Sequence, residues 1–553
     1  MTENNHAQPL EKKYFDTLRI ISISERKTAF VGEIVTYTAD YEQIKPSESA
    51  DIKNIIWEIK VDGILVRTLF GETIEFKVKT EWEGKEITVN ARDFFGQFDE
   101  NIGQKTKIEN ESNTTGKFLV HFRRPDGYDG SYGFDWLQPE FENCDSSFDL
   151  KKEYNPTKIH EQEYLTPWLS IAKGQTIKVN LTIEVLTDSH PLSDNDIIKL
   201  PAQKGIRFNP EEIKAKDITG TVKHFPTGED KGIAIEVTCD DTVSTDTIVN
   251  VYNQEDTVIG NLSLFKNDKE YLMPIRVVQL VREGFESEDE NSMIMHLINS
   301  ADFSGCFEIS ECMERVEEYM NKYAYNQAFV RCQMERGSDN VIKTHTVTIN
   351  ETEWKNKNYI NAGGEIFDRD NLNSDLLNIY KNQIEKKTRF FKGIILFITN
   401  FKAAGMAGKG NLNIIDDRNC ILFKNGGITK KDVYVHEIGH VLSLSHPFQK
   451  RDVKKIQQRE QEVVAANNYL NNPKVSQENK RIFWQENKEG IKYKNRQSYL
   501  YYRNKYTFYE SDKNNPEKGA TKCMFMDYTV DRKVFTQWQW RTIQESVKRY
   551  FSR

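Results

Sequence analysis

Apolar and polar residues alternate along the first part of the chain, which is the pattern of strands with one buried face. Between residues 15 and 100 the alternating segments are LRIISIS, TAFVGEIVTYTADY, IIWEIKVDGILVRTLF, TIEFKVK and KEITVNARDFF. An Asp62-Gly63 pair lies inside the third of them and divides it into two strands, as a tight hairpin turn requires. The pattern predicts a small antiparallel β-sandwich over 15–100, preceded by a polar leader at 1–14.

Trp57 is expected on a central strand of this sandwich and in its core, which favours the immunoglobulin-like form of the fold. Trp82 fits either the same core or a ligand contact, and the core is favoured. After a predicted linker at 101–116, further strand patterns follow: KFLVHFRR, TPWLSIAKGQTIKVNLTIEVL, GIAIEVTC and DTIVNVY. We expect a second β-sandwich-like domain over 117–275. An aromatic cluster at 133–136 is better explained by packing between domains than by ligand binding.

From residue 276 the apolar spacing becomes that of helices that alternate with buried strands. The segments EDENSMIMHLINSADF and FEISECMERVEEYMNKYAYNQAFV have helical spacing, and THTVTINETEW and FFKGIILFITNF have strand spacing. His345 lies on one of these strands and is expected to be structural. The pattern predicts an α+β domain over 276–553. A charged, tyrosine-rich helical insertion at 450–515 is expected to border its cleft.

Composition and charge narrow the classes of partner. The chain has 553 residues, of which 38% are hydrophobic, enough for several packed domains. Its net charge of −8 gives no reason to expect nucleic acid or an anionic membrane as partner. No apolar run is long enough for a transmembrane segment, and residues 1–13 lack the apolar core of a signal peptide. The seven cysteines are scattered, so buried free thiols are expected.

Residues that carry chemistry are concentrated in one stretch, VYVHEIGHVLSLSH, at 433–446. His436 and His440 are four residues apart, so both side chains would leave the same face of a helix. Glu437 lies beside them and would take a proton from a water held between them. His446 would supply the third protein ligand of a catalytic Zn²⁺, which keeps its fourth position for water.

A second motif, CMFMDYT at 523–529, lies downstream and contains Met526. Together the two motifs resemble the metzincin zinc peptidases, and in particular their pappalysin-like branch. That branch pairs a helix of the HEIGHxLGLxHTF type with a Met-turn of the NFMDYT type and a following FTxxQ helix. The resemblance covers two parts of the chain, 390–450 and 520–550.

The chain departs from the metzincin pattern HExxHxxGxxH at Ser443, where the pattern has glycine. Glycine is used there because the backbone leaves the helix with positive φ, which costs serine about 1 kcal/mol. Further departures lie at two flanking positions, Pro447 and Cys523. A rival third ligand is a carboxylate of the predicted insertion, Glu460 or Glu462. We prefer His446, because a Met-turn accompanies sites with three histidines.

The resemblance implies a zincin-type catalytic domain with Zn²⁺ as cofactor, held by three residues: His436, His440 and His446. It implies that Glu437 is the general base that activates water toward a peptide carbonyl. Tyr528 would ligate zinc at rest or donate a hydrogen bond to the tetrahedral intermediate, and its alternative role is packing. Met526 would pack beneath the ligands and do no chemistry.

Three functions fit this sequence. The first is a zinc endopeptidase that acts on protein or peptide substrates. The second is a β-sandwich module for binding, adhesion or delivery with a vestigial zinc site, although an intact Glu437 argues against loss of activity. The third is a bacterial peptidase effector or toxin, made in the cytoplasm and exported by a specialised secretion system. That function would bring secretion machinery or an immunity protein as partner.

Overall fold

The computed structural model of the chain falls into two compact units, which are described one after the other. The first unit comprises residues 1–116, 147–166 and 450–505, and the second comprises 117–146, 167–449 and 506–553. Within them the structure describes residues 17–24, 26, 28–30, 34–45, 55–82, 84–93, 102–109, 118–138, 149–186, 192–218, 221–222, 232–367, 371–388, 390–410, 418–448, 453–504, 506, 508, 523–528 and 532–551. The predicted leader, 1–14, lies outside the described residues.

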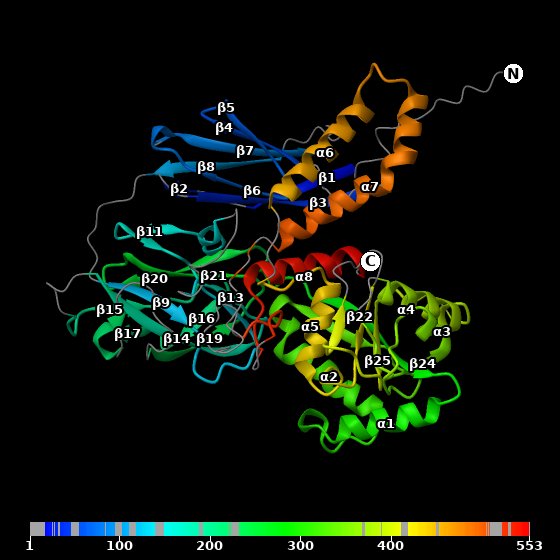
Figure 1. Ribbon diagram of the computed structural model, residues 1–553. Helices are drawn as coiled ribbons and strands as arrows, with labels where there is room; N and C mark the ends of the chain where they lie inside the picture. The colour runs from blue at the N-terminus through cyan, green and yellow to red at the C-terminus, as the bar shows by residue number, and fades with distance from the viewer. Residues whose placement is uncertain are drawn as a thin grey trace. The chain divides into compact units, whose positions relative to one another are not determined.

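The N-terminal part of the first unit is a β-sandwich (Figure 1). Its sheets have the orders β1-β3-β6 and β2-β8-β7-β4-β5. The strands are β1 (Thr17–Ile23), β2 (Thr28–Phe30), β3 (Ile34–Lys45), β4 (Ile55–Val61), β5 (Ile64–Phe70), β6 (Thr73–Lys77), β7 (Glu86–Asp93) and β8 (Ile102–Glu109). Inward side chains of both sheets form one core that buries Trp57 and Trp82. The predicted sandwich and its core tryptophans are confirmed.

The strand order of this sandwich agrees with the immunoglobulin-like form. β4, β7 and β8 lie next to one another as the C, F and G strands of that fold do, and Trp57 on β4 takes the place of its core tryptophan. β8 corrects the predicted linker at 101–116, because this strand pairs with β7. Its inward positions include the polar Thr106, whose hydroxyl lies 2.6 Å from that of Tyr37, and this weakens the apolar alternation.

The predicted insertion forms two helices of the first unit, α6 (Val453–Asn471) and α7 (Gln477–Arg503), which pack on each other. The rings of Tyr469 and Phe483 join them at a centroid distance of 4.5 Å. Residues 509–515 of the insertion lie outside the described residues. Its expected place at the border of the cleft stays a prediction.

The second unit begins with another two-sheet sandwich, as predicted, with sheet orders β10-β13-β21-β20-β15-β17 and β16-β19-β14-β18 and with β9 on β14. Both sheets contribute to one core. The strands are β9 (Phe118–Arg123), β10 (Gly133–Asp135), β13 (Trp168–Ser170), β14 (Thr176–Val185), β15 (Ile197–Lys199), β16 (Ile206–Asn209), β17 (Glu212–Lys214), β18 (Thr221–Val222), β19 (Ile233–Cys239), β20 (Thr247–Asn253) and β21 (Val258–Leu264).

A mixed sheet with helices completes the second unit. β22 (Tyr271–Arg282) is its long middle strand and runs parallel to β23 (Val330–Met334), β24 (Thr344–Ile349) and β25 (Ile394–Thr399). β25 pairs in parallel with β27 (Asn419–Leu422), and the short strand β26 (Gly408–Gly410) runs antiparallel along β27. The expected domain boundary near residue 275 falls inside β22. Residues 271–275 of this strand already pair with β23, so the mixed sheet begins before the expected boundary.

The helices of this part are α1 (Glu286–Ile298), α2 (Ile309–Tyr323), α3 (Glu351–Asn356), α4 (Leu372–Tyr380), α5 (Lys431–Val441) and α8 (Gln537–Tyr550). α8 packs on the sandwich of the same unit. A Cβ atom on Gly133 would lie 2.6 Å from the Trp540 ring, and the Gln537 N–H donates to the buried carboxylate of Asp135 at 3.0 Å. The cluster at 133–136 therefore serves packing between the sandwich and this helix, as expected.

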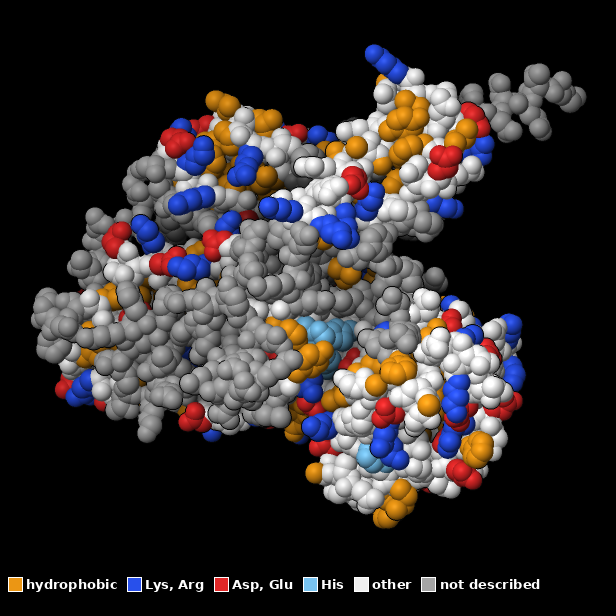
Figure 2. Space-filling view, in the orientation of Figure 1, with side chains coloured by type: hydrophobic (Ala, Val, Ile, Leu, Met, Phe, Trp, Pro, Cys, Tyr) orange, Lys and Arg blue, Asp and Glu red, His pale blue; other side chains and the backbone are white. Residues whose placement is uncertain are grey.

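The surface charges, the thiols and the hydropathy of the helices can be set beside what the composition predicts. On the face drawn in Figure 2, basic and acidic side chains are interspersed over the described residues. Six of the seven cysteines are described, and each is a free thiol, as expected. None of the described helices is long and apolar enough to cross a bilayer.

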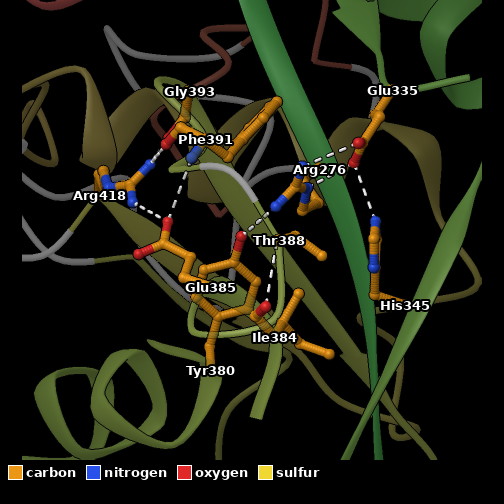
Figure 3. A network of polar contacts seen from close by, with 10 residues as sticks. All are labelled: Arg276, Glu335, His345, Tyr380, Ile384, Glu385, Thr388, Phe391, Gly393 and Arg418. Carbon is orange, nitrogen blue, oxygen red and sulfur yellow. Dashed lines mark hydrogen bonds and ion pairs between the residues drawn. The ribbon is translucent and has the colours of Figure 1, made fainter. Parts of the chain in front are cut away.

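A buried polar network crosses the mixed sheet (Figure 3). The Arg276 guanidinium on β22 donates to both carboxylate oxygens of Glu335 and, at 2.6 Å, to the Tyr380 hydroxyl. His345 on β24 contacts the same carboxylate at 2.9 Å, so its predicted structural role is confirmed. Burial raises the pKa of Glu335, but hydrogen bonds from His345 and Arg276 outweigh it and lower that pKa to about 2.

Glu335→Gln should destabilise the second unit by about 2–3 kcal/mol at pH 7, since a carboxylate with a lowered pKa stabilises the fold above its unfolded pKa. The difference from wild type should shrink as the pH falls from about 4.5 toward 2, through the folded pKa. Urea unfolding at several pH values measures it. The control is Glu270→Gln, which removes an exposed pair with Arg331 and should cost less than about 1 kcal/mol. Equal, pH-independent losses in both variants would contradict the prediction.

Candidate metal centre

Helix α5 carries the HExxH motif, and its residues 433–441 are all buried. Its N-terminal end is fixed by side chains from elsewhere in the unit: the Asp302 carboxylate accepts from the Lys431 N–H at 2.9 Å, and Arg532 pairs with Asp432 at 2.7 Å. A Cβ atom on Gly439 would lie 2.5 Å from the Met526 sulfur. Glycine therefore allows the fully buried Met526 to pack directly under the helix, where the Met-turn residue was expected.

The chain reverses after α5 and brings a third histidine back to the helix. Ser443 has φ of 72°, the left-handed conformation for which glycine was expected. The N–H groups of Ser443 and Leu444 bond to the carbonyls of His440 and Gly439 at 2.9 and 3.0 Å. Serine thus makes the predicted turn, and His446 follows it.

The three histidines converge on one point. Their Nε2 atoms are each 3.1 Å from the other two. Nδ1 of His436 faces the Phe525 carbonyl at 2.8 Å, and Nδ1 of His440 faces the Leu444 carbonyl at 2.7 Å. Because a carbonyl can only accept, both protons are assigned to Nδ1. Two bare nitrogen lone pairs then face each other at 3.1 Å, an arrangement that a cation between them stabilises.

Zinc fits this donor set. Three nitrogens at 2.0–2.1 Å from a tetrahedral zinc lie about 3.3 Å apart. Burial lowers the pKa of His440 to about 4 and that of His446 to about 3, and it lowers the pKa of His436 well below its ordinary value. All three rings are therefore neutral near pH 7, the form that binds a metal.

Glu437 is buried between its helix and the edge strand β26. Burial raises the pKa of its carboxyl group to about 8, while the Gly410 N–H and the Arg532 guanidinium lower that pKa in part. A Cβ atom on Gly408 would lie 2.5 Å from Cγ of Glu437, and one on Gly410 would lie 2.2 Å from its backbone oxygen. The Gly-Lys-Gly sequence thus lets the strand lie directly on the helix.

Tyr528 lies beside the histidines. Its ring centroid is 4.7 Å from that of His446 and 5.6 Å from that of His436, and 68% of the residue is exposed. Such exposure argues against core packing as its role. Its ring lies beside the candidate ligands, where a phenol could take part in binding a metal or a substrate.

The rival carboxylates lie on α6 in the first unit, where Glu462 pairs with Lys494 at 2.7 Å. Among the described residues, the group that could hold a metal consists of His436, His440 and His446. Sequence reasoning missed two parts of the site, Arg532 and the glycines of β26. The available signal for the strand was its pair of glycines two residues apart.

Comparison with known proteins gave matches among solved structures. The chain matches no protein-family model and no curated protein. Matching solved structures include fibronectin(III)-like modules of Clostridium thermocellum CbhA, with 19% identity over 17% of this chain and 100% of that one, at a TM-score of 0.12. A chimeric titin Z1Z2 tandem matches with 10% identity over 45% of this chain and 98% of that one, at 0.13. Tandem Ig repeats of Dlar match with 9% identity over 45% and 97%, at 0.14.

Proposed function

We propose that this protein is a zinc-dependent endopeptidase of the metzincin type. One observation carries the proposal: three neutral imidazoles, those of His436 and His440 buried and that of His446 partly buried, converge with their Nε2 atoms 3.1 Å apart, and the buried Glu437 follows the first of them in the helix. Three nitrogen ligands and one open position are the donor set of catalytic zinc. Support for the metzincin type comes from the turn at Ser443, which returns His446 to the helix, and from Met526 beneath Gly439.

The residues divide the chemistry between them. Zinc, when bound by His436, His440 and His446, supplies a Lewis acid that polarises a carbonyl and lowers the pKa of its water. Glu437 takes the proton of the attacking water and returns it to the leaving amine. A group with a pKa near the working pH suits this exchange, and a nearby dication would lower the pKa from about 8 toward neutrality. Tyr528 would help to hold zinc at rest or would donate a hydrogen bond to the substrate during the reaction.

The route of the protein in the cell rests on the sequence alone. Export as an effector or toxin by a specialised secretion system, with secretion machinery or an immunity protein as partner, stays a prediction. The alternative of a binding or delivery module with a vestigial zinc site predicts the same fold without turnover. Catalysis therefore has to be measured directly.

Purified protein should contain about one zinc per chain and cut members of a peptide library. Removal of the metal with a chelator should abolish cleavage, and added Zn²⁺ should restore it, because the three histidines are the ligands. Metal analysis and mass spectrometry of the digest measure both outcomes. Zinc without cleavage would favour the binding module, and cleavage that resists the chelator would overturn a metal mechanism.

A further inference from the structure

One short turn contacts both the helix that carries His436 and His440 and the segment that follows the Met-turn. It is η7 (Tyr325–Ala328), which follows α2, and α2 packs on α5 (Figure 1). The Tyr325 hydroxyl donates to the carbonyl of Val435, the residue before His436, at 2.8 Å. Gln327 is fully buried and bonds through both ends of its amide to the segment after the Met-turn. Its Oε1 accepts from Phe535 N–H at 3.0 Å and its Nε2 donates to the Lys533 carbonyl at 2.7 Å.

The segment that Gln327 holds also fixes a metal ligand. Val534 pairs with the Met-turn: its carbonyl accepts from the Phe525 N–H at 2.9 Å, and its N–H donates to the Cys523 carbonyl at 3.0 Å. The Phe525 carbonyl in turn accepts from Nδ1 of His436 at 2.8 Å. This last bond sets the tautomer and the ring orientation of the ligand. A displacement of Val534 would therefore shift Phe525, with which it pairs, and the Phe525 carbonyl would in turn shift the ring of His436.

The second β-sandwich enters the same network through the loop between β9 and β10. Gln327 Nε2 also faces the Gly130 carbonyl at 3.2 Å, and the Asn326 amide donates to the Ser131 carbonyl at 2.8 Å. Gly130 has φ of 89°, and a Cβ atom there would lie 2.5 Å from the Tyr323 carbonyl and 2.9 Å from the Lys533 carbonyl. The loop thus lies in backbone contact with the segment that supports His436.

We propose that Gln327 and Gly130 are positioning residues for His436, so that the second β-sandwich supports the metal centre. This inference rests on the proposed zinc site and goes beyond it. It assigns a role to a domain that, on the delivery hypothesis, would be a separable module. Both residues act through the Met-turn backbone and neither touches the metal.

The glycines of this loop provide a matched test. Gly127 and Gly130 both have positive φ, so alanine at either position carries a similar backbone strain of about 1 kcal/mol. A Cβ atom on Gly127 has no heavy atom within 4 Å, whereas one on Gly130 meets the network. Gly130→Ala in the full chain should weaken Zn²⁺ binding about tenfold, the lower end of what partners of metal-binding histidines contribute. Gly127→Ala should bind Zn²⁺ as the wild type does.

Competition with a chromophoric chelator measures the Zn²⁺ affinity, and the absorption of the Co²⁺-loaded protein reports the ligand geometry. Gln327→Met keeps the length of the side chain but loses its hydrogen bonds, so it should alter the Co²⁺ spectrum and weaken binding like Gly130→Ala. This variant carries the test if Gly130→Ala does not fold. Wild-type affinity and spectrum in a folded Gly130→Ala or Gln327→Met variant would overturn the inference alone. A wild type that binds no Zn²⁺ would overturn the proposed function and this inference together.

Discussion

Glu437→Gln is expected to lower peptide turnover by about 10²–10⁴-fold, the usual contribution of a general base, while zinc stays bound. Glutamine keeps the size of the side chain and can still accept from the Gly410 N–H, but it cannot take a proton. The structure places this carboxyl group in a buried site that raises its pKa to about 8, so a neutral group suits the surroundings. The free energy of unfolding should therefore change by less than about 1 kcal/mol.

Single-turnover kinetics with a fluorogenic peptide, beside metal analysis of the same sample, measure this result. Glu462→Gln is the control, because Glu462 lies on α6 and pairs only with neighbouring helix residues in the described contacts. It should leave turnover unchanged. Near wild-type cleavage by Glu437→Gln would mean that another group is the base, and the assignment of this site as a peptidase centre would fail.

His446→Ala is expected to remove most of the zinc and abolish activity. The variant leaves two imidazoles, and a site with two protein ligands holds zinc far more weakly than one with three. His440→Ala should show the same loss, because its Nε2 occupies an equivalent place at 3.1 Å from the other two. Dialysis against a metal buffer followed by metal analysis gives the occupancy.

The same measurement decides between His446 and the carboxylate rival. Glu460→Gln and Glu462→Gln should retain one zinc per chain, since the group of potential ligands among the described residues consists of histidines. Normal zinc in His446→Ala together with loss in Glu462→Gln would show that the insertion supplies the third ligand. The metzincin comparison would then no longer apply to this site.

Much of the fold follows from local patterns in the sequence. The sandwich at 15–100 is predictable because one face of each strand meets the core, so apolar residues recur at every second position. β8 escaped prediction because its inward positions include Thr106, which is paired with the hydroxyl of Tyr37, a residue far away in the sequence. The predicted boundary near 275 fell inside β22. This strand is buried on both faces, so its residues stay apolar where its partner changes from β23 to β24, and the sequence does not show where the strand begins.

The proposed metal ligands were predictable for a different reason. Helical spacing alone places His436 and His440 on one face, so their convergence is a local property. The groups that tune and support the site are set by tertiary contacts. Arg532 reaches Asp432 across 100 residues, and the acceptor for His436 is the backbone oxygen of Phe525, which any residue type could supply. Such contacts do not change the pattern of apolar and polar residues along the sequence.

The conformation of Ser443 bears on how such sites are searched for. A pattern that demands glycine at this position describes a residue type, whereas the site depends on a backbone angle, which serine adopts here with φ of 72°. A sequence-pattern search that requires glycine would reject this chain at that position, although its third histidine returns to the helix. A structural search would retain the chain if it asked for two histidines on a helix, then a residue with left-handed backbone conformation, then a third histidine.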